Sequence, residues 1–195
     1  MPEKLFEQKN GTDRAREGLL PKNKNLFLIG FMGSGKSAVS RTLKKEYGFE
    51  ILEMDEEIEK RQGMPISEIF RVYGEEAFRK METDLLEELK QKSQTVISCG
   101  GGTPMWEENV KNMRECGRIV LLTAKPETIL QRVSRSHNRP LLEGNKNIAY
   151  ITELMEKRKD KYNAAADILI HTDDKSREEI CREILEKAGG CTWGM

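Results

Sequence analysis

One short stretch constrains this chain more than any other. Residues 30–37 read Gly-Phe-Met-Gly-Ser-Gly-Lys-Ser, which is the G-x-x-x-x-G-K-[ST] pattern of a phosphate-binding P-loop. An apolar stretch of strand length, 26–29, precedes the pattern, and apolar residues recur at helical spacing after it. A strand, a glycine-rich loop and a helix in this order direct backbone N–H groups and the positive helix end toward an anion. The stretch therefore predicts a nucleoside triphosphate site.

The residues of this loop have distinct uses in binding a triphosphate. Glycine lets the backbone curl inward on an anion, the Lys36 ammonium can reach the β- and γ-phosphates, and the Ser37 hydroxyl can ligate Mg²⁺. Lys36 is also a candidate catalytic residue, because it supplies positive charge to the transferring group. The expected nucleotide contacts are Gly33, Ser34, Gly35, Lys36, Ser37 and Ala38.

Size and charge limit the classes of partner. The chain has 195 residues, enough for one domain with a proper core. Lys plus Arg and Asp plus Glu both number 33, so no net field attracts nucleic acid or a membrane. Neither an apolar run of membrane-spanning length nor a signal-peptide core is present. The four cysteines lack C-x-x-C spacing, which favours reduced thiols in a cytoplasmic protein.

Strand-like and helix-like stretches alternate along the chain. Apolar stretches near 26–29, 49–53, 95–99, 118–122 and 168–170 predict five strands, with helical patterns between them. This alternation predicts an α/β fold of three layers, in which helices flank a five-stranded parallel sheet. Gly74 is expected to break a helical region that ends near Lys92, and the last helix is expected to reach Lys187. Residues 1–24 are expected to form a flexible leader, and residues 188–195 a tail.

Four other features of the sequence are suited to binding a ligand. Glu53-x-Asp55 and the triplet 100–102, three successive glycines, each follow a predicted strand, where open α/β sheets bind ligands. Arg79 and Glu82 lie three residues apart on one helix, a spacing that by itself indicates a surface salt bridge. Residues 133–147 have no regular period and include Arg139. In a phosphoryl-transfer enzyme such a loop is typical of a lid that carries an arginine to the triphosphate.

Taken in order, these motifs resemble the shikimate kinase family, part of the nucleoside monophosphate kinase-like branch of P-loop proteins. The resemblance spans about residues 25–187, the expected kinase domain. It rests on the P-loop at 30–37, Glu53-x-Asp55 with Ile58-Glu59, Gly74-Glu75, Phe78-Arg79, Glu82, Gly100–Gly102, Arg139-Pro140-Leu141-Leu142, and Arg158 with Tyr162.

The resemblance implies phosphorylation of the 3-hydroxyl of shikimate by ATP with Mg²⁺, a step of aromatic amino-acid and chorismate biosynthesis. It implies a substrate-binding region at about 54–92 and a lid at about 133–147. Family members are commonly monomers, so a monomer is expected. The residues that would hold shikimate are Asp55, Arg79, Gly100, Gly101, Gly102 and Arg158.

The resemblance also implies roles for single side chains. Asp55 would orient or deprotonate the attacking hydroxyl, and Glu82 would fix Arg79. Arg139 would meet the transferring phosphoryl group, and Arg132 would pack near adenine. Arginine suits the substrate carboxylate, because its planar fork binds a carboxylate at two points.

Glu53 departs from the family pattern, which usually has aspartate at this position. The family residue helps to hold Mg²⁺, often through water. Glutamate keeps the charge but adds a methylene, so the Mg²⁺ shell is expected to shift while activity persists; the sequence leaves the metal preference open.

Two alternative functions compete with this one. A related small-molecule kinase such as a gluconate-type kinase would share the P-loop, but would not be expected to combine Arg79, the glycine triplet and Arg158. The second alternative is a catalytically inactive nucleotide-binding module, in which Glu53 in place of aspartate would be the first sign of lost activity. Retention of Lys36, Ser37, Asp55 and Arg139 argues against that module.

Overall fold

The computed structural model describes residue 20, residues 24–134 and residues 147–189. Most of the expected lid, Arg139 included, lies outside these residues, as does most of the expected leader. The elements are β1 (Asn25–Ile29), α2 (Lys36–Tyr47), β2 (Glu50–Glu53), α3 (Met54–Gln62), α4 (Ile66–Leu89), β3 (Thr95–Ser98), η1 (Thr103–Met105), α5 (Glu107–Cys116), β4 (Gly117–Thr123), α6 (Pro126–Ser134), α7 (Ile148–Ala165), β5 (Ile168–His171) and α8 (Arg177–Gly189).

The five strands form one parallel sheet in the order β2-β3-β1-β4-β5, so the predicted fold class is confirmed. β1 lies at the centre, where Phe27 is paired in register with Ile97 of β3 and Ile119 of β4. Every residue of β1 is buried, because both faces of the sheet are covered. Because β2, β3 and β1 are neighbouring parallel strands, the loops that follow them lie together at one end of the sheet, where the strands end.

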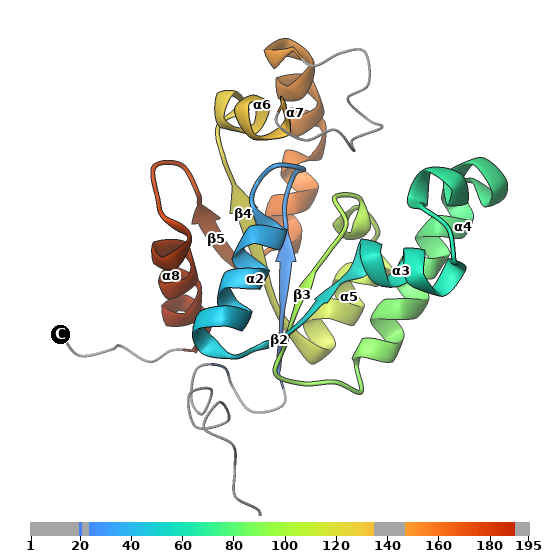
Figure 1. Cartoon of the computed structure of the whole chain (residues 1–195), viewed down its shortest axis with the longest axis horizontal. Helices are drawn as coiled ribbons and strands as arrows, with labels where there is room; N and C mark the ends of the chain where they lie inside the picture. Colours follow the sequence, from blue (N-terminus) through green and yellow to red (C-terminus); the bar gives the residue numbers. More distant parts are fainter. Residues whose placement is uncertain (1–19, 21–23, 135–146, 190–195) are drawn as a thin grey trace, which may run out of the picture.

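Helices cover the two faces of the sheet as separate layers (Figure 1). Successive residues of β1 point to opposite faces, since side chains alternate along a strand. Leu28 packs with residues of α2 and α8 on one face. Phe27 packs with residues of α3, α4, α5 and α7 on the other. A third apolar cluster joins Phe31 of the P-loop to α6 and α7 through Ile129 and Ile151.

Gly74 interrupts α4, as the sequence predicts. It adopts φ 81° and ψ 171°, a backbone conformation that kinks the helix between its two parts. The second part ends at Leu89 rather than near Lys92, and α8 continues past Lys187 to Gly189. Leu20 is 4% exposed and packs with the α2–α8 side of the core. Among the described helices, none combines the length and apolarity needed to span a membrane.

Candidate active site

The P-loop joins the end of β1 to the start of α2. Gly30 has φ 142°, and a side chain at this position would collide with the carbonyl oxygen of Leu122 in β4. Glycine is therefore required where the loop crosses the neighbouring strand. The first turn of α2 contains no acidic residue, so its N–H groups and positive dipole end remain suited to a phosphate.

The side chain of Lys36 lies over its own loop. Its ammonium donates to the carbonyl oxygens of Gly30, at 2.8 Å, and Phe31, at 3.3 Å. Both acceptors belong to the turn that the sequence assigns to phosphate binding. A bound triphosphate would therefore compete with these carbonyls for the Lys36 ammonium.

Glu53 connects the end of β2 to the first turns of α2. Its Oε2 accepts a hydrogen bond from the Ser37 hydroxyl at 2.8 Å, and its Oε1 accepts one from the Ser40 hydroxyl at 2.5 Å. Ser40 is fully buried and was not singled out in the sequence. Its spacing of three residues from Ser37, on one side of the same helix, was the signal available. The longer glutamate is thus held at two points.

The glycine triplet is the meeting point of the predicted substrate residues. An added Cβ at Gly100 would lie 2.8 Å from Oδ1 of Asp55 and 2.8 Å from Oε1 of Glu82. At Gly102 it would collide with the Arg79 guanidinium. Side chains from α3 and α4 therefore rest directly on the backbone of Gly100 and Gly102, and any larger residue at these two positions would displace them.

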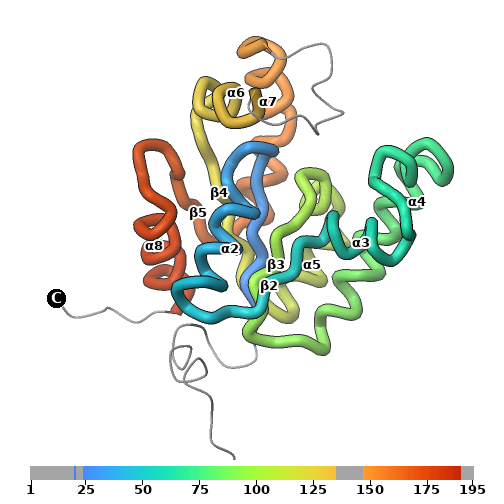
Figure 2. The backbone as a smooth tube through the Cα atoms, viewed as in Figure 1, coloured from blue at the N-terminus to red at the C-terminus, as the bar shows by residue number. Residues whose placement is uncertain are grey.

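The middle glycine faces α7 and the P-loop. An added Cβ at Gly101 would lie 3.7 Å from Nη1 of Arg158, 3.7 Å from the Tyr162 hydroxyl and 3.9 Å from the carbonyl oxygen of Gly30. The Tyr162 hydroxyl donates to the Gly101 carbonyl at 2.7 Å, and the Arg158 guanidinium lies 6.0 Å from the ring centre of Phe31. Burial raises the pKa of Tyr162, which keeps this donor protonated. Figure 2 shows the loops after β1 and β3 at the same end of the sheet.

Glu82 is buried and its partner Arg79 is only partly exposed, so the surface salt bridge that their spacing alone suggested is wrong. Nη1 of Arg79 donates to Oε2 of Glu82 at 2.6 Å, and the Glu82 side chain is 0% exposed. The guanidinium also contacts the exposed Glu75 at 2.9 Å and lies 5.3 Å from the ring centre of Phe78. Burial raises the pKa of Glu82, whereas the Arg79 charge and a hydrogen bond from Thr103 oppose that rise.

Arg132 lies against the other side of the P-loop. Its Nη1 donates to the carbonyl oxygens of Gly33 and Ser34, both at 3.3 Å, and to the Thr172 hydroxyl at 3.0 Å. Thr172 directly follows β5 and was missed in the sequence, although its place at the carboxyl edge of a predicted strand was a usable signal. The guanidinium thus joins the P-loop to the end of β5.

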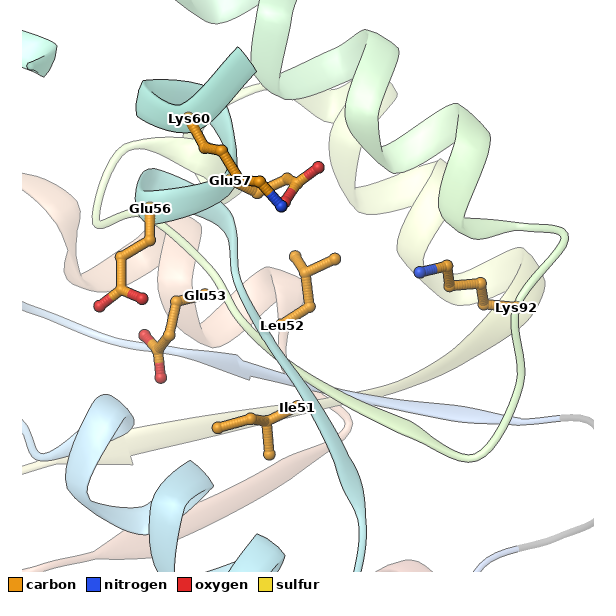
Figure 3. Close-up of a pocket in the computed structure, with 7 residues that line it drawn as sticks. All are labelled: Ile51, Leu52, Glu53, Glu56, Glu57, Lys60 and Lys92. Atoms are coloured by element: carbon orange, nitrogen blue, oxygen red, sulfur yellow. The ribbon is translucent and has the colours of Figure 1, made fainter. Parts of the chain in front are cut away.

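A groove beside the edge strand β2 is separate from this convergence (Figure 3). It shares only Glu53 with the predicted site and carries charges of both signs. Its lining residues are Ile51, Leu52, Glu53, Glu56, Glu57, Lys60 and Lys92.

The described part of the predicted site therefore has two halves, which lie together at the carboxyl ends of the strands. The P-loop forms one half, and two arginines with a carboxylate around a glycine triplet form the other. A P-loop beside a pair of arginines is the arrangement of a phosphotransferase of the P-loop kinase class.

Comparisons with known proteins assign the family. The family model described as shikimate kinase matches residues 32–188. A shikimate kinase from Persephonella marina is 43% identical over 162 residues, which cover 83% of this chain and 97% of the relative. One from Moorella thermoacetica is 42% identical over 164 residues, which cover 83% and 92%. The chain belongs to the shikimate kinase family, whose members are ATP-dependent phosphotransferases.

Solved structures agree with this assignment. A shikimate kinase from Acinetobacter baumannii, described in complex with shikimate, superimposes with a TM-score of 0.79 at 32% identity and covers 90% of this chain and 95% of its own. A shikimate kinase from Aquifex aeolicus gives 0.70 at 37% identity, covering 85% and 96%. A gluconokinase from Sinorhizobium meliloti gives 0.57 at 18% identity, covering 86% and 93%, which shows a shared fold alone.

Proposed function

We propose that this chain transfers the γ-phosphoryl group of ATP to the 3-hydroxyl of shikimate, giving shikimate 3-phosphate and ADP. The convergence of Asp55, Arg79 and Arg158 on the glycine triplet, next to the P-loop, is the observation that carries the proposal. Two guanidinium groups suit the carboxylate of shikimate, because the planar fork makes paired hydrogen bonds to a carboxylate. The shikimate-bound relative from Acinetobacter baumannii supports the same substrate.

Asp55 is the proposed partner of the attacking hydroxyl. It lies in the first turn of α3, exposed to solvent, and its Oδ1 approaches Gly100. A carboxylate there accepts a hydrogen bond from a ring hydroxyl and orients it, or takes its proton as transfer proceeds. Most of the acceleration in phosphoryl transfer comes from positioning and charge, which Lys36 and the arginines supply.

Ser37 and Glu53 are the proposed Mg²⁺ residues. Among the described residues no three His, Cys, Asp or Glu side chains converge on a metal position. The Ser37 hydroxyl and the Glu53 carboxylate fit Mg²⁺, because this ion in kinases takes one or two protein oxygens and completes its shell with phosphate oxygens and water. The Ser37 hydroxyl lies 2.8 Å from Glu53, so one residue would bind the ion and the other its water. When bound, Mg²⁺ neutralises charge on the β- and γ-phosphate oxygens.

The remaining elements of the proposal come from the sequence. We assign the kinase domain to residues 25–187 and the phosphoryl contact to Arg139, which lies outside the described residues. Arg132 is proposed to face the adenine side of the nucleotide, next to the end of β5 where its guanidinium contacts Thr172. We also propose that the chain works in the cytoplasm as a monomer, as the family resemblance implies, and without nucleic acid or membrane partners, which its zero net charge does not attract.

The direct test is ADP release from ATP and Mg²⁺ by purified protein, measured with shikimate, with gluconate and with neither. We expect turnover with shikimate alone. Replacing Arg158 by alanine should raise KM for shikimate about 10- to 100-fold, because a hydrogen bond to a charged group contributes about 1.5–3 kcal/mol. ATP binding should persist in this variant.

Arg118→Ala is the matched control, since Arg118 is an exposed arginine at the start of β4, the opposite end of that strand from the site. It should leave both KM values unchanged. Turnover with gluconate would reassign the substrate. ATP binding without turnover on either acid would instead identify a nucleotide-binding module.

A further inference from the structure

A buried carboxylate beneath the proposed shikimate site needs more than one partner. Glu82 is 0% exposed, and removal of a carboxylate from water is costly unless both oxygens find donors. Oε2 accepts from Arg79 at 2.6 Å, and Oε1 accepts from the hydroxyl of Thr103, which is also fully buried. The second donor therefore comes from η1, the short element that follows the glycine triplet.

Thr103 is held in turn by α5. Its carbonyl oxygen accepts from Nδ2 of Asn109 at 3.0 Å, and Asn109 is 0% exposed. Oδ1 of Asn109 accepts from the Thr83 hydroxyl at 2.7 Å, and that hydroxyl also lies 3.1 Å from the carbonyl oxygen of Arg79. Hydrogen bonds therefore link Glu82 of α4, through Thr103 of η1 and Asn109 of α5, to Thr83 of α4. Because Glu82 and Thr83 are neighbours in the chain, these four residues form a closed ring.

Two carboxylates share the Arg79 guanidinium, and the ring holds one of them, Glu82. Glu75 contacts the guanidinium at 2.9 Å but its side chain is 67% exposed, whereas Glu82 draws the same group inward, against Gly102. With its Oε1 occupied by Thr103, Glu82 presents Oε2 to one nitrogen of Arg79. Nε and Nη2 of Arg79 donate to Oε1 of Glu75, at 3.3 Å and 2.9 Å, so Nη1 and Nη2 each keep one N–H group for a ligand.

We propose that Thr103 and Asn109 are positioning residues for substrate, which act through Glu82 to hold the Arg79 guanidinium against the glycine triplet in the orientation that receives the carboxylate of the acid substrate. This inference rests on the proposed function, which places that carboxylate at Arg79. The hydrogen bonds of the Thr103 and Asn109 side chains join them to α4 and η1 and not to the P-loop in the described structure.

The test is Thr103→Val, which keeps the shape of the side chain and removes its hydroxyl. With Oε1 of Glu82 left without this donor, Arg79 turns to satisfy both oxygens and presents fewer donors to the substrate. KM for shikimate should rise about 5- to 20-fold, because a lost hydrogen bond to a charged group has this order of effect. KM for ATP should stay within about twofold, and Thr103→Ser should restore KM for shikimate.

Thr83→Val breaks the ring at a partly exposed position that tolerates substitution, and should raise KM for shikimate in the same direction by a smaller factor. Thr152→Val is the matched control, since this exposed hydroxyl donates to the Ile148 carbonyl oxygen within α7, away from the ring. Equal changes in both KM values would mean a merely structural ring and would overturn the inference, as would an unchanged KM for shikimate in Thr103→Val. If the wild-type protein showed no turnover with shikimate, the proposed function would be wrong, and this inference with it.

Discussion

At the scale of single residues, Glu53 shows how one added methylene is accommodated. An aspartate at the end of β2 has a shorter reach toward α2, whereas Glu53 reaches both Ser37 and Ser40. Groups that hold a metal-associated carboxylate typically change metal affinity when they are removed. We expect Ser40→Ala to weaken the binding of ADP in the presence of Mg²⁺ by roughly tenfold, while binding of ADP in EDTA stays unchanged. Isothermal titration calorimetry measures both.

Ser93→Ala is the control for this substitution, because Ser93 is an exposed serine just before β3. It should alter neither titration. If Ser40→Ala weakened ADP binding equally with and without Mg²⁺, the serine would support the P-loop itself and not the carboxylate proposed to hold the metal.

At the scale of elements, α8 has a capping box that can be tested by itself. The backbone N–H of Ser176 donates to the Glu179 carboxylate at 2.8 Å, and the backbone N–H of Glu179 donates to the Ser176 hydroxyl at 3.2 Å. Removal of such a cap weakens the start of a helix. We expect Ser176→Ala to lower Tm by roughly 2–4 °C, with KM values unchanged.

The same cap predicts a pH dependence. The hydrogen bonds from the backbone and the hydroxyl of Ser176 lower the pKa of Glu179. A lowered folded-state pKa stabilises the protein above the unfolded pKa, and this contribution is lost as pH falls through the folded-state value. The Tm difference between wild type and Glu179→Gln should therefore be largest near neutral pH and shrink in acid. A difference that grew in acid would contradict the cap.

Elements were more predictable from the sequence than the contacts between them. Five strands and the break at Gly74 followed from hydrophobic period and from glycine chemistry, which are local properties. The burial of Glu82 did not follow, because a spacing of three residues does not say which side of a helix faces the core. Thr103 and Asn109 were missed for a related reason, since their partners lie on α4, distant in sequence.

At the scale of the whole molecule, the two halves of the site touch through backbone but use different side chains. The Gly30 carbonyl and the Gly101 backbone adjoin, while Lys36 belongs to the P-loop and Arg158 to α7. A ligand that binds only the folded state raises the free energy of unfolding by mass action, by about 2.7 kcal/mol at 100 times Kd. For a chain of this size, that is a rise in Tm of roughly 5–10 °C.

We therefore expect ADP with Mg²⁺ and shikimate each to raise Tm of the wild-type protein, as differential scanning fluorimetry would record. Arg158→Ala should keep the rise caused by ADP and lose most of the rise caused by shikimate, because only the second ligand is proposed to bind its guanidinium. If Arg158→Ala abolished both rises, α7 would be needed to assemble the P-loop, through the packing of Arg158 near Phe31. If it abolished neither, the carboxylate would be bound elsewhere, and Arg79 would be the next residue to replace.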